Sequence, residues 1–257
     1  MTDRVLGVIP ARLASTRLPR KPLHPIAGRP LVEWVWRRVR ELGVFDAVVV
    51  ATDSPEVEAA AHAFGASVVR TRADHPSGTD RVAEVARREE WRGYPVIVNV
   101  QGDEPFVRGD HLHAAIGLVR AGWDVGTVAT PIASADEWRE PAVVKVVRGD
   151  DGRALVFTRA PVPFPRDAAP DFASGAYLRH VGVYVYARDA LLRWVSLPEG
   201  ALERIEKLEQ LRALAAGLTI GVAVGEPAEG GVDTPADALR AERTILSTLA
   251  TPALERA

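Results

Sequence analysis

Residues 46–70 read DAVVVATDSPEVEAAAHAFGASVVR, and this stretch holds the unit that decides the fold. Its two ends are short apolar runs rich in Val, which is typical of buried strands. The middle, residues 54–64, predicts a helix with Ser54 as its N-cap and Gly65 after its last turn. A strand, a helix and a strand in this order predict a βαβ unit with parallel strands.

The same alternation continues on both sides of this unit. Strands are predicted at residues 5–9, 46–51, 66–70, 95–100 and 125–131, and helices at 30–42, 54–64, 79–91 and 110–121. The pattern predicts an α/β fold with a mostly parallel sheet. Because ligands bind beyond the carboxyl ends of the strands in such a sheet, the loops after residues 9, 51, 70 and 100 are the candidate binding segments.

The pattern changes after residue 135. The further elements expected are a hairpin of strands 142–148 and 154–158, a Pro-rich loop over 159–177, strands at 180–186 and 219–224, and helices at 202–216 and 234–249. We expect residues 1–250 to form a single domain, followed by a frayed tail at 251–257.

The composition excludes several classes of protein. The 257 residues include 32 Lys or Arg and 34 Asp or Glu, so the net charge of -2 gives no reason to expect a nucleic-acid or membrane-surface partner. The chain has no Cys, which excludes disulfides and thiolate catalysis and fits a reducing cytoplasm. No signal-peptide pattern and no run of apolar residues long enough to span a bilayer is found, so we expect a cytoplasmic protein without a membrane partner.

The near-neutral total hides a cationic segment at the start of the chain. Residues 1–40 contain nine Lys or Arg and only two acids, and residues 10–22 read PARLASTRLPRKP directly after the first strand. Small residues let this backbone approach a ligand, and its N–H groups and cations together suit a triphosphate. The four cations are Arg12, Arg17, Arg20 and Lys21. The alternative is a solvated basic loop, since neither a Walker A nor a Rossmann glycine motif is present.

Two acids are candidates for holding a cation. Asp103 follows the strand predicted at 95–100, and Gly102 before it allows a sharp turn that points the carboxylate toward a ligand. Asp233 stands at the start of the helix predicted at 234–249. A turn or a helix cap explains either residue alone. A fold that brings both together would suit Mg²⁺, which takes one or two carboxylates and completes its shell with phosphate and water.

Seven segments, in order along the chain, resemble the 3-deoxy-manno-octulosonate cytidylyltransferase family, also called CMP-Kdo synthetases. They are PARLASTRLPRKPL (10–23), TRADHPSGTDRVAEV (71–85), NVQGDEP (99–105), RAPVP (159–163), LRHVGVYVY (178–186), IEKLEQLR (205–212) and GVDTP (231–235). The resemblance implies a Rossmann-like fold of the nucleotide-diphospho-sugar transferase type, Mg²⁺ as cofactor and a homodimer. It also implies transfer of CMP from CTP to the anomeric hydroxyl of 3-deoxy-D-manno-octulosonate (Kdo), with release of diphosphate, for lipopolysaccharide-type glycan synthesis.

The resemblance further implies which residues form the site. The triphosphate would lie against Ala11, Arg12, Ser15, Thr16, Arg17 and Lys21. Mg²⁺ would be held by Asp103 and Asp233, and catalysis would rest on Arg12, Lys21 and Asp103. The rest of the nucleotide would be bound by Arg72, Ser77, Gly78 and Gln101. The sugar acid would be bound by Gln101, Arg159, Arg166, His180, Tyr184, Glu209 and Gln210, with Arg166 on its carboxylate. Residues 1–135 would then be the CTP-binding half, 136–225 the sugar-acid and dimerisation part, and 226–250 the closing helix.

Several alternatives remain open at this point. Ser77 and Thr79 can cap the helix that follows them, with Thr79 the expected cap, and His75 is expected in a turn. The sequence also departs from the family pattern in the sugar-acid part, with Phe164 in place of Trp and Arg204 in place of His. One alternative is therefore a cytidylyltransferase for another sugar acid, such as an amino-Kdo or a nonulosonate. Another is a nucleotide-binding sensor without catalytic activity.

Overall fold

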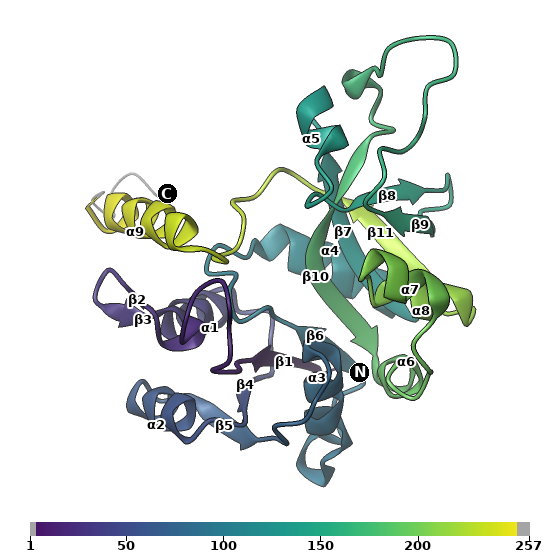
Figure 1. Ribbon diagram of the computed structural model, residues 1–257. Coiled ribbons are helices and arrows are strands. Elements are labelled where there is room, and N and C mark those ends of the chain that lie inside the picture. The colour runs from purple at the N-terminus through teal and green to yellow at the C-terminus, as the bar shows by residue number, and fades with distance from the viewer. Residues whose placement is uncertain (1–3, 251–257) are drawn as a thin grey trace. The chain divides into compact units, whose positions relative to one another are not determined.

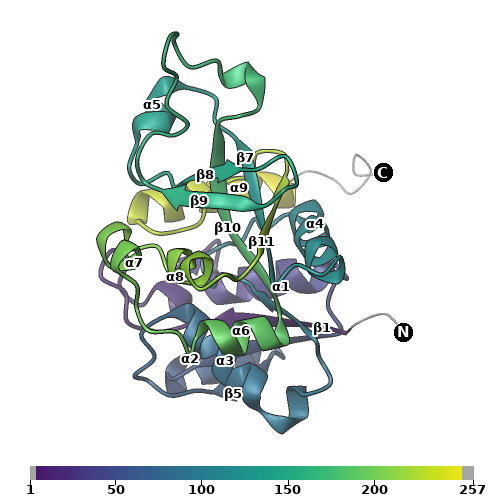
Figure 2. The same cartoon turned by 90° about the vertical axis from the view of Figure 1, so that its right-hand side faces the viewer.

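The computed structural model describes residues 4–250, and the tail expected at 251–257 lies outside the described residues. The chain forms two compact units, each considered by itself (Figure 1 and Figure 2). Unit 1 is residues 4–6, 86–99 and 108–227, and unit 2 is residues 7–85, 100–107 and 228–250. The domain boundaries expected at residues 135 and 225 remain predictions. Within residues 4–250, no helix is both long and apolar enough to cross a membrane.

Unit 2 contains the βαβ unit that residues 46–70 predict. Its elements are β1 (Val5–Pro10, which begins in unit 1), η1 (Lys21–Leu23), β2 (Pro25–Ile26), β3 (Arg29–Pro30), α1 (Leu31–Glu41), β4 (Ala47–Thr52), α2 (Pro55–Ala63), β5 (Ser67–Arg70), α3 (Gly78–Arg87) and α9 (Pro235–Ala250). Strands β4 and β5 are parallel, as predicted. The Ser54 hydroxyl accepts a hydrogen bond from Val57 N at 3.4 Å, which confirms the predicted N-cap of α2.

Unit 1 contains the remaining strands. Its elements are η2 (Glu89–Trp91), β6 (Val96–Asn99), α4 (Gly109–Arg120), β7 (Val125–Pro131), α5 (Ala135–Arg139), β8 (Lys145–Arg148), β9 (Ala154–Thr158), η3 (Phe172–Ser174), β10 (Leu178–Ala187), α6 (Arg188–Trp194), α7 (Ala201–Glu206), α8 (Gln210–Ala215) and β11 (Ile220–Val224). The strand order within this unit is β11-β7-β10-β6. Strand β11 is parallel to β7, whereas β10 is antiparallel to β6, to β7 and, at Arg179, to β8.

The predicted α/β fold is confirmed, with β10 as the reversed strand of a mostly parallel sheet. The predicted hairpin is also confirmed, since β8 and β9 pair antiparallel with Lys145 opposite Thr158. The helix predicted at 79–91 is shorter than expected, because α3 ends at Arg87 and a separate 3₁₀ turn, η2, follows. The two short helices α5 and α6 and the small β2–β3 hairpin have no counterpart in the prediction.

The single helix predicted over residues 202–216 is wrong, because the structure has two short helices there, α7 and α8. Lys207 adopts the left-handed conformation (φ 54°), and its N–H donates to Glu203 O at 2.7 Å, which ends α7. The break lets Arg212 of α8 turn back onto α7. Its Nε lies 2.8 Å from Glu203 Oε2 and its Nη2 lies 2.5 Å from Glu203 Oε1. The two short helices are thus linked by a buried ion pair between Glu203 and Arg212.

This ion pair generates a stability prediction. Only 6% of the Glu203 side chain is exposed, and its Oε2 also accepts a hydrogen bond from Gly200 N at 3.1 Å. Glu203→Ala removes the carboxylate that pairs with the buried Arg212 guanidinium, so we expect the free energy of unfolding to fall by about 3 kcal/mol. Glu199→Ala is the matched control, because Glu199 is half exposed and 4.0 Å from Arg204. Equal urea midpoints for the two variants would contradict the assigned role of Glu203.

Candidate functional site

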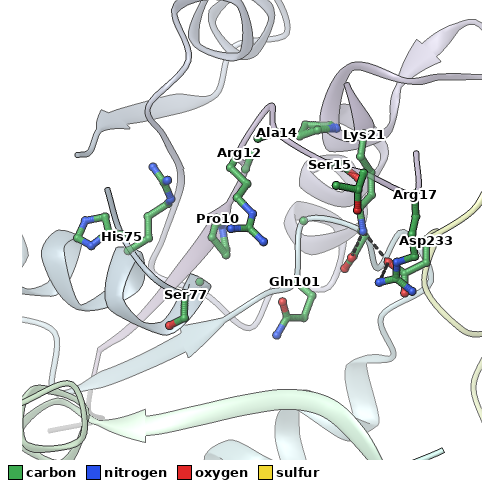
Figure 3. A pocket seen from close by; sticks show the side chains of 17 residues that line it. Pro10, Arg12, Ala14, Ser15, Arg17, Lys21, His75, Ser77, Gln101 and Asp233 are labelled. Atoms are coloured by element: carbon green, nitrogen blue, oxygen red, sulfur yellow. Dashed lines mark hydrogen bonds and ion pairs between the residues drawn. The ribbon is translucent and has the colours of Figure 1, made fainter. Parts of the chain in front are cut away.

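The candidate site is a cavity of about 770 Å³ in unit 2 (Figure 3). Its lining comes from the loop after β1, the segment that leads into α3, the turn at 101–103 and Asp233, two residues before α9. The lining residues are Pro10, Ala11, Arg12, Ala14, Ser15, Thr16, Arg17, Lys21, Pro22, His75, Ser77, Gly78, Arg81, Gln101, Gly102, Asp103 and Asp233. Lys21, Arg17 and Asp233 meet at one end of the cavity, and His75 and Ser77 lie at the other (Figure 3).

The cationic loop is held by contacts at both ends. Ala11 N donates to Ala51 O at 2.9 Å, which ties the start of the loop to β4. Further along, Leu18 is buried and its N–H lies 3.4 Å from the Ser15 hydroxyl. Three of the four predicted cations line the cavity, whereas the fourth, Arg20, forms an ion pair with Glu56 of α2. Most of the charge of the loop therefore lies along the cavity, although Arg17 is also 66% exposed to solvent.

The segment that carries Asp103 lies directly against the end of β1. A Cβ on Gly102 would sit 2.5 Å from Pro10 O, closer than real Cβ atoms approach, so a side chain does not fit at this position. The glycine is therefore required by close backbone approach, and it has no left-handed φ of the kind that a sharp glycine turn uses. The predicted need for Gly102 is confirmed, but its cause is different. This contact fixes where the Asp103 carboxylate projects.

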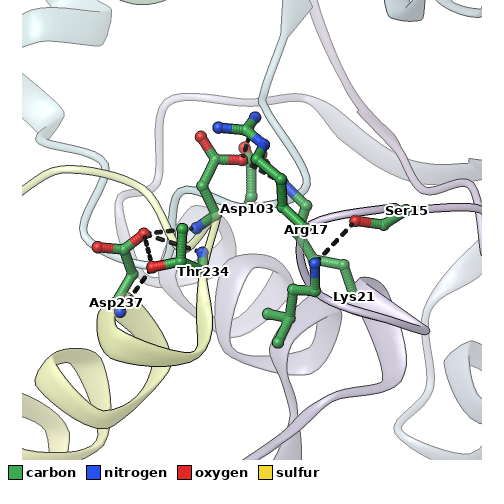
Figure 4. Close-up of polar contacts among 8 residues, drawn as sticks. Ser15, Arg17, Lys21, Asp103, Thr234 and Asp237 are labelled. Carbon is green, nitrogen blue, oxygen red and sulfur yellow. Dashed lines mark hydrogen bonds and ion pairs between the residues drawn. The ribbon is translucent and has the colours of Figure 1, made fainter. Parts of the chain in front are cut away.

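The fold also brings Asp233 beside Asp103. Val232 N donates to Asp103 O at 2.8 Å, so the two segments are joined through the backbone one residue away from Asp233. The helix-capping alternative for Asp233 is wrong, because Thr234 Oγ1 accepts the hydrogen bond from Asp237 N at 3.2 Å at the start of α9. Figure 4 shows the hydrogen bonds between Thr234 and Asp237. With the cap supplied by Thr234, the Asp233 carboxylate points to the cationic loop (Figure 3).

The two carboxylates converge on one ammonium group. Lys21 Nζ lies 2.5 Å from Asp103 Oδ2 and 2.8 Å from Asp233 Oδ1, and Arg17 Nη2 lies 3.0 Å from the same Asp233 oxygen. Partial burial acts to lower the pKa of Lys21, but the charges and hydrogen bonds of Asp103 and then Asp233 outweigh it and raise that pKa above its usual value. The ammonium group is therefore firmly cationic, and the carboxylate oxygens lie within reach of a single cation.

The segment before α3 gives a mixed outcome for the expected base-binding residues. Ser77 and Gly78 line the cavity, but Arg72 does not. The exposed Arg72 side chain pairs with Asp74 instead, with its Nε 2.9 Å from Asp74 Oδ1. The prediction that Thr79 caps α3 is wrong, because α3 begins at Gly78. The cap is Ser77, whose Oγ accepts a hydrogen bond from Asp80 N at 3.2 Å. Ser77 is thus both the helix cap and part of the cavity wall.

Arg81 is a cavity residue that the sequence reasoning missed. Its side chain is only 4% exposed, with Nη2 2.9 Å from Asp53 Oδ1 and Nη1 bonded to the Thr71 hydroxyl. These bonds tie α3 to the segments that follow β4 and β5. The sequence does contain one indication of this role, because Arg81 lies four residues before Val85 on the apolar face of the predicted helix. A cation on an apolar helix face is buried when the helix packs, and a buried charge needs a polar partner.

The residues expected to bind the sugar acid, apart from Gln101, all belong to unit 1. The centroids of the His180 and Tyr184 rings on β10 lie 5.2 Å apart. Glu209 interacts electrostatically with the Tyr184 hydroxyl. Burial lowers the pKa of His180 to about 3, so the ring is neutral at ordinary pH. Burial, and then the neighbouring Tyr186 and Glu209, raise the pKa of Tyr184 well above its usual value. The buried Tyr184 hydroxyl has no hydrogen-bond partner within the described residues.

The other three expected sugar-acid residues differ in their surroundings. Gln210 is buried at the start of α8. Arg159 is bound to the backbone, with its Nε 2.7 Å from Glu206 O and its Nη1 2.9 Å from Pro141 O. Arg166 is 89% exposed and pairs with its neighbour Asp167 at 2.9 Å. Arg166 thus carries a guanidinium open to solvent, whereas Arg159 is used to hold the end of β9.

Three comparisons place this architecture among known proteins. Residues 6–220 match the model of a family described as cytidylyltransferase. A 3-deoxy-manno-octulosonate cytidylyltransferase of Gemmatimonas aurantiaca is 56% identical over 239 residues, 92% of each chain, and one of Syntrophotalea carbinolica is 45% identical over 93% of this chain and 97% of its own. A solved structure described as CMP:2-keto-3-deoxy-manno-octonic acid synthetase complexed with CTP has 40% identity and a TM-score of 0.88, covering 95% of this chain and 99% of its own. With this likeness over nearly the whole length, the chain belongs to the 3-deoxy-manno-octulosonate cytidylyltransferase family.

Proposed function

We propose that this chain transfers CMP from CTP to the anomeric hydroxyl of Kdo. The observation that carries the proposal is the cavity of unit 2, where three cations of the loop after β1 line a space of about 770 Å³ beside two carboxylates. That volume suits a small-molecule site. The names of the relatives, 3-deoxy-manno-octulosonate cytidylyltransferases, point to the same reaction.

The reaction requires a bond between the sugar hydroxyl oxygen and the α-phosphorus of CTP. The bond from the α-phosphorus to its bridging oxygen breaks, diphosphate leaves with that oxygen, and the hydroxyl proton is released. Catalysis of this kind rests mainly on positioning and on stabilising negative charge. Arg12, Arg17 and Lys21 would supply the cations for the triphosphate, and the backbone from Arg12 to Thr16 would supply N–H groups. Ser77, Gly78 and Gln101, which line the same cavity, would bind the rest of the nucleotide.

The proposal includes Mg²⁺, which Asp103 and Asp233 would hold. No group of three or more His, Cys, Asp or Glu side chains in the described part of the chain is arranged to hold a metal ion. Two converging carboxylates still suit Mg²⁺, which obtains its remaining ligands from phosphates and water. When bound, the ion would neutralise charge on the phosphates during transfer.

The sugar acid is proposed to be bound by the residues expected in unit 1. His180, Tyr184, Glu209 and Gln210 offer hydrogen-bonding groups from β10 and the α7–α8 region. The unpartnered hydroxyl of Tyr184 supports this role, because a buried hydroxyl without a partner is costly unless a ligand completes it. Arg166 is proposed to pair with the sugar carboxylate, for which its planar guanidinium is well suited.

Diphosphate release in a coupled assay with CTP and Mg²⁺ tests the proposal. We expect Kdo to give the highest kcat/KM among Kdo, an amino-Kdo and a nonulosonate. Phe164 and Arg204, where the sequence departs from the family, make this comparison of sugar acids necessary. Faster turnover of another acid would assign the chain to that substrate instead. CTP binding with no turnover of any of the three would favour the nucleotide-binding sensor.

Asp103→Asn tests the proposed metal ligand. The amide keeps the size of the side chain but loses its charge, so we expect kcat to fall by about 100-fold or more. The loop cations remain in place, so the Kd for CTP, measured by calorimetry, should change little. Asp110→Asn is the control, since Asp110 belongs to unit 1 and pairs with Arg108 at 2.7 Å. A near-normal rate for Asp103→Asn would remove this residue from the mechanism.

We also propose that the protein is a cytoplasmic homodimer. Three exposed apolar side chains support the dimer: Leu155 of β9 and Leu202 and Ile205 of α7, which are 58%, 58% and 78% exposed. The Thr158 hydroxyl at the end of β9 lies 2.6 Å from Glu206 Oε1 at the end of α7, so the two elements are joined. Light scattering is expected to give twice the 27.7 kDa chain mass, and a monomer at assay concentration would contradict the dimer.

The absence of Cys supports the proposed cytoplasmic location.

A further inference from the structure

The Lys21 ammonium group lies in the position that a cation bridging Asp103 and Asp233 would take. It is within 2.8 Å of one oxygen of each carboxylate, and 18% of its side chain is exposed (Figure 3). Arg17 adds a second cation on Asp233. Two negative and two positive side chains thus balance at this end of the cavity, and the carboxylates are already neutralised by the protein itself.

A divalent cation cannot share these oxygens with the ammonium group. Mg²⁺ binds carboxylate oxygens at about 2.0–2.1 Å, so an ion bridging the two aspartates would lie almost on top of Nζ. Repulsion between a double and a single positive charge at such a separation is severe. Metal binding between Asp103 and Asp233 therefore requires Lys21 to move.

The displaced ammonium group needs a new anionic partner. Lys21 lines the same cavity as Arg12 and Ser15, where the proposed function puts the triphosphate. With a triphosphate present, the ammonium group can exchange its carboxylate contacts for phosphate oxygens. Without a triphosphate, the ammonium group would lose its two hydrogen bonds to the carboxylates and gain only hydrogen bonds to water. Moving the Lys21 ammonium group away from the carboxylates therefore costs much more free energy in the absence of the nucleotide.

We propose that Lys21 is a positioning residue that occupies the cation position and makes divalent-cation binding conditional on the triphosphate. It keeps Asp103 and Asp233 together before the nucleotide arrives, and yields the position to the ion when phosphate oxygens become available. This inference rests on the proposed function for the location of the triphosphate. It adds an order of events: a divalent cation binds with the nucleotide or after it, and not before.

Mn²⁺ binding without nucleotide, followed by electron paramagnetic resonance of the free ion, tests the inference. Lys21→Met keeps an unbranched side chain of similar length and removes the competing charge, so we expect Mn²⁺ to bind about tenfold more tightly than to the wild-type protein. The matched control is Arg20→Met, which removes the neighbouring cation that pairs with Glu56 outside the cavity and is expected to leave Mn²⁺ affinity unchanged. Adding Asp103→Asn to Lys21→Met should abolish the gain, which locates the ion at this carboxylate.

Equal Mn²⁺ affinity for the wild-type protein and Lys21→Met would overturn the inference. Lys21→Gln serves in its place if thermal unfolding shows that the Met variant does not fold. The wild-type protein provides a test that needs no variant, because tight Mn²⁺ binding at Asp103 without nucleotide would also overturn it. Turnover of CTP and Kdo is measured separately, so a failed inference with normal turnover leaves the proposed function standing.

Discussion

The contact between the Lys21 ammonium group and the carboxylates of Asp103 and Asp233 is the interaction on which the site depends. It joins three segments of unit 2 that are far apart in the chain: the loop after β1, the turn at 101–103 and the segment that leads into α9. One backbone hydrogen bond, from Val232 N to Asp103 O, sets the two acidic segments side by side. At this meeting point the charges of Lys21 and Arg17 are balanced by the two carboxylates.

Local backbone constraints make this meeting possible. Gly102 lets its segment lie against Pro10 O, where a Cβ would come within 2.5 Å, and so brings Asp103 up to the end of β1. Thr234 caps α9, so that the preceding carboxylate is available to the cationic loop. A small residue and a helix cap are ordinary local features. Here they decide which side chains line the cavity.

The sequence predicted the regular elements of the alternating half because their signals are local. The Val-rich runs of β4 and β5 and the Ser54 cap of α2 each depend on neighbouring residues, and all three are confirmed. The break between α7 and α8 was missed because a lysine, Lys207, adopts a conformation that usually indicates glycine. The buried pair of Glu203 with Arg212 that accompanies this break is invisible in a helical pattern.

For the candidate site, the sequence predicted which residues line the cavity better than it predicted which side chains contact one another. The loop cations and Asp103 follow from their position after predicted strands, but nothing local shows that Arg20 turns to Glu56 or that Asp233 reaches Lys21. Both outcomes depend on contacts between segments separated by 36 and 212 positions. The buried Arg81 was missed for the same reason, since its partner Asp53 is on another segment.

We propose that the cavity of unit 2 binds CTP, with a divalent cation at the two aspartates. A crystal structure with CTP and Mn²⁺, in which anomalous scattering locates the metal, tests both parts of this proposal. We expect triphosphate density against Arg12, Arg17 and Lys21, and a Mn²⁺ peak bound by Asp103 and Asp233, with the Lys21 ammonium group moved onto phosphate. Triphosphate density away from the loop after β1, or a Mn²⁺ peak at other acids, would contradict it.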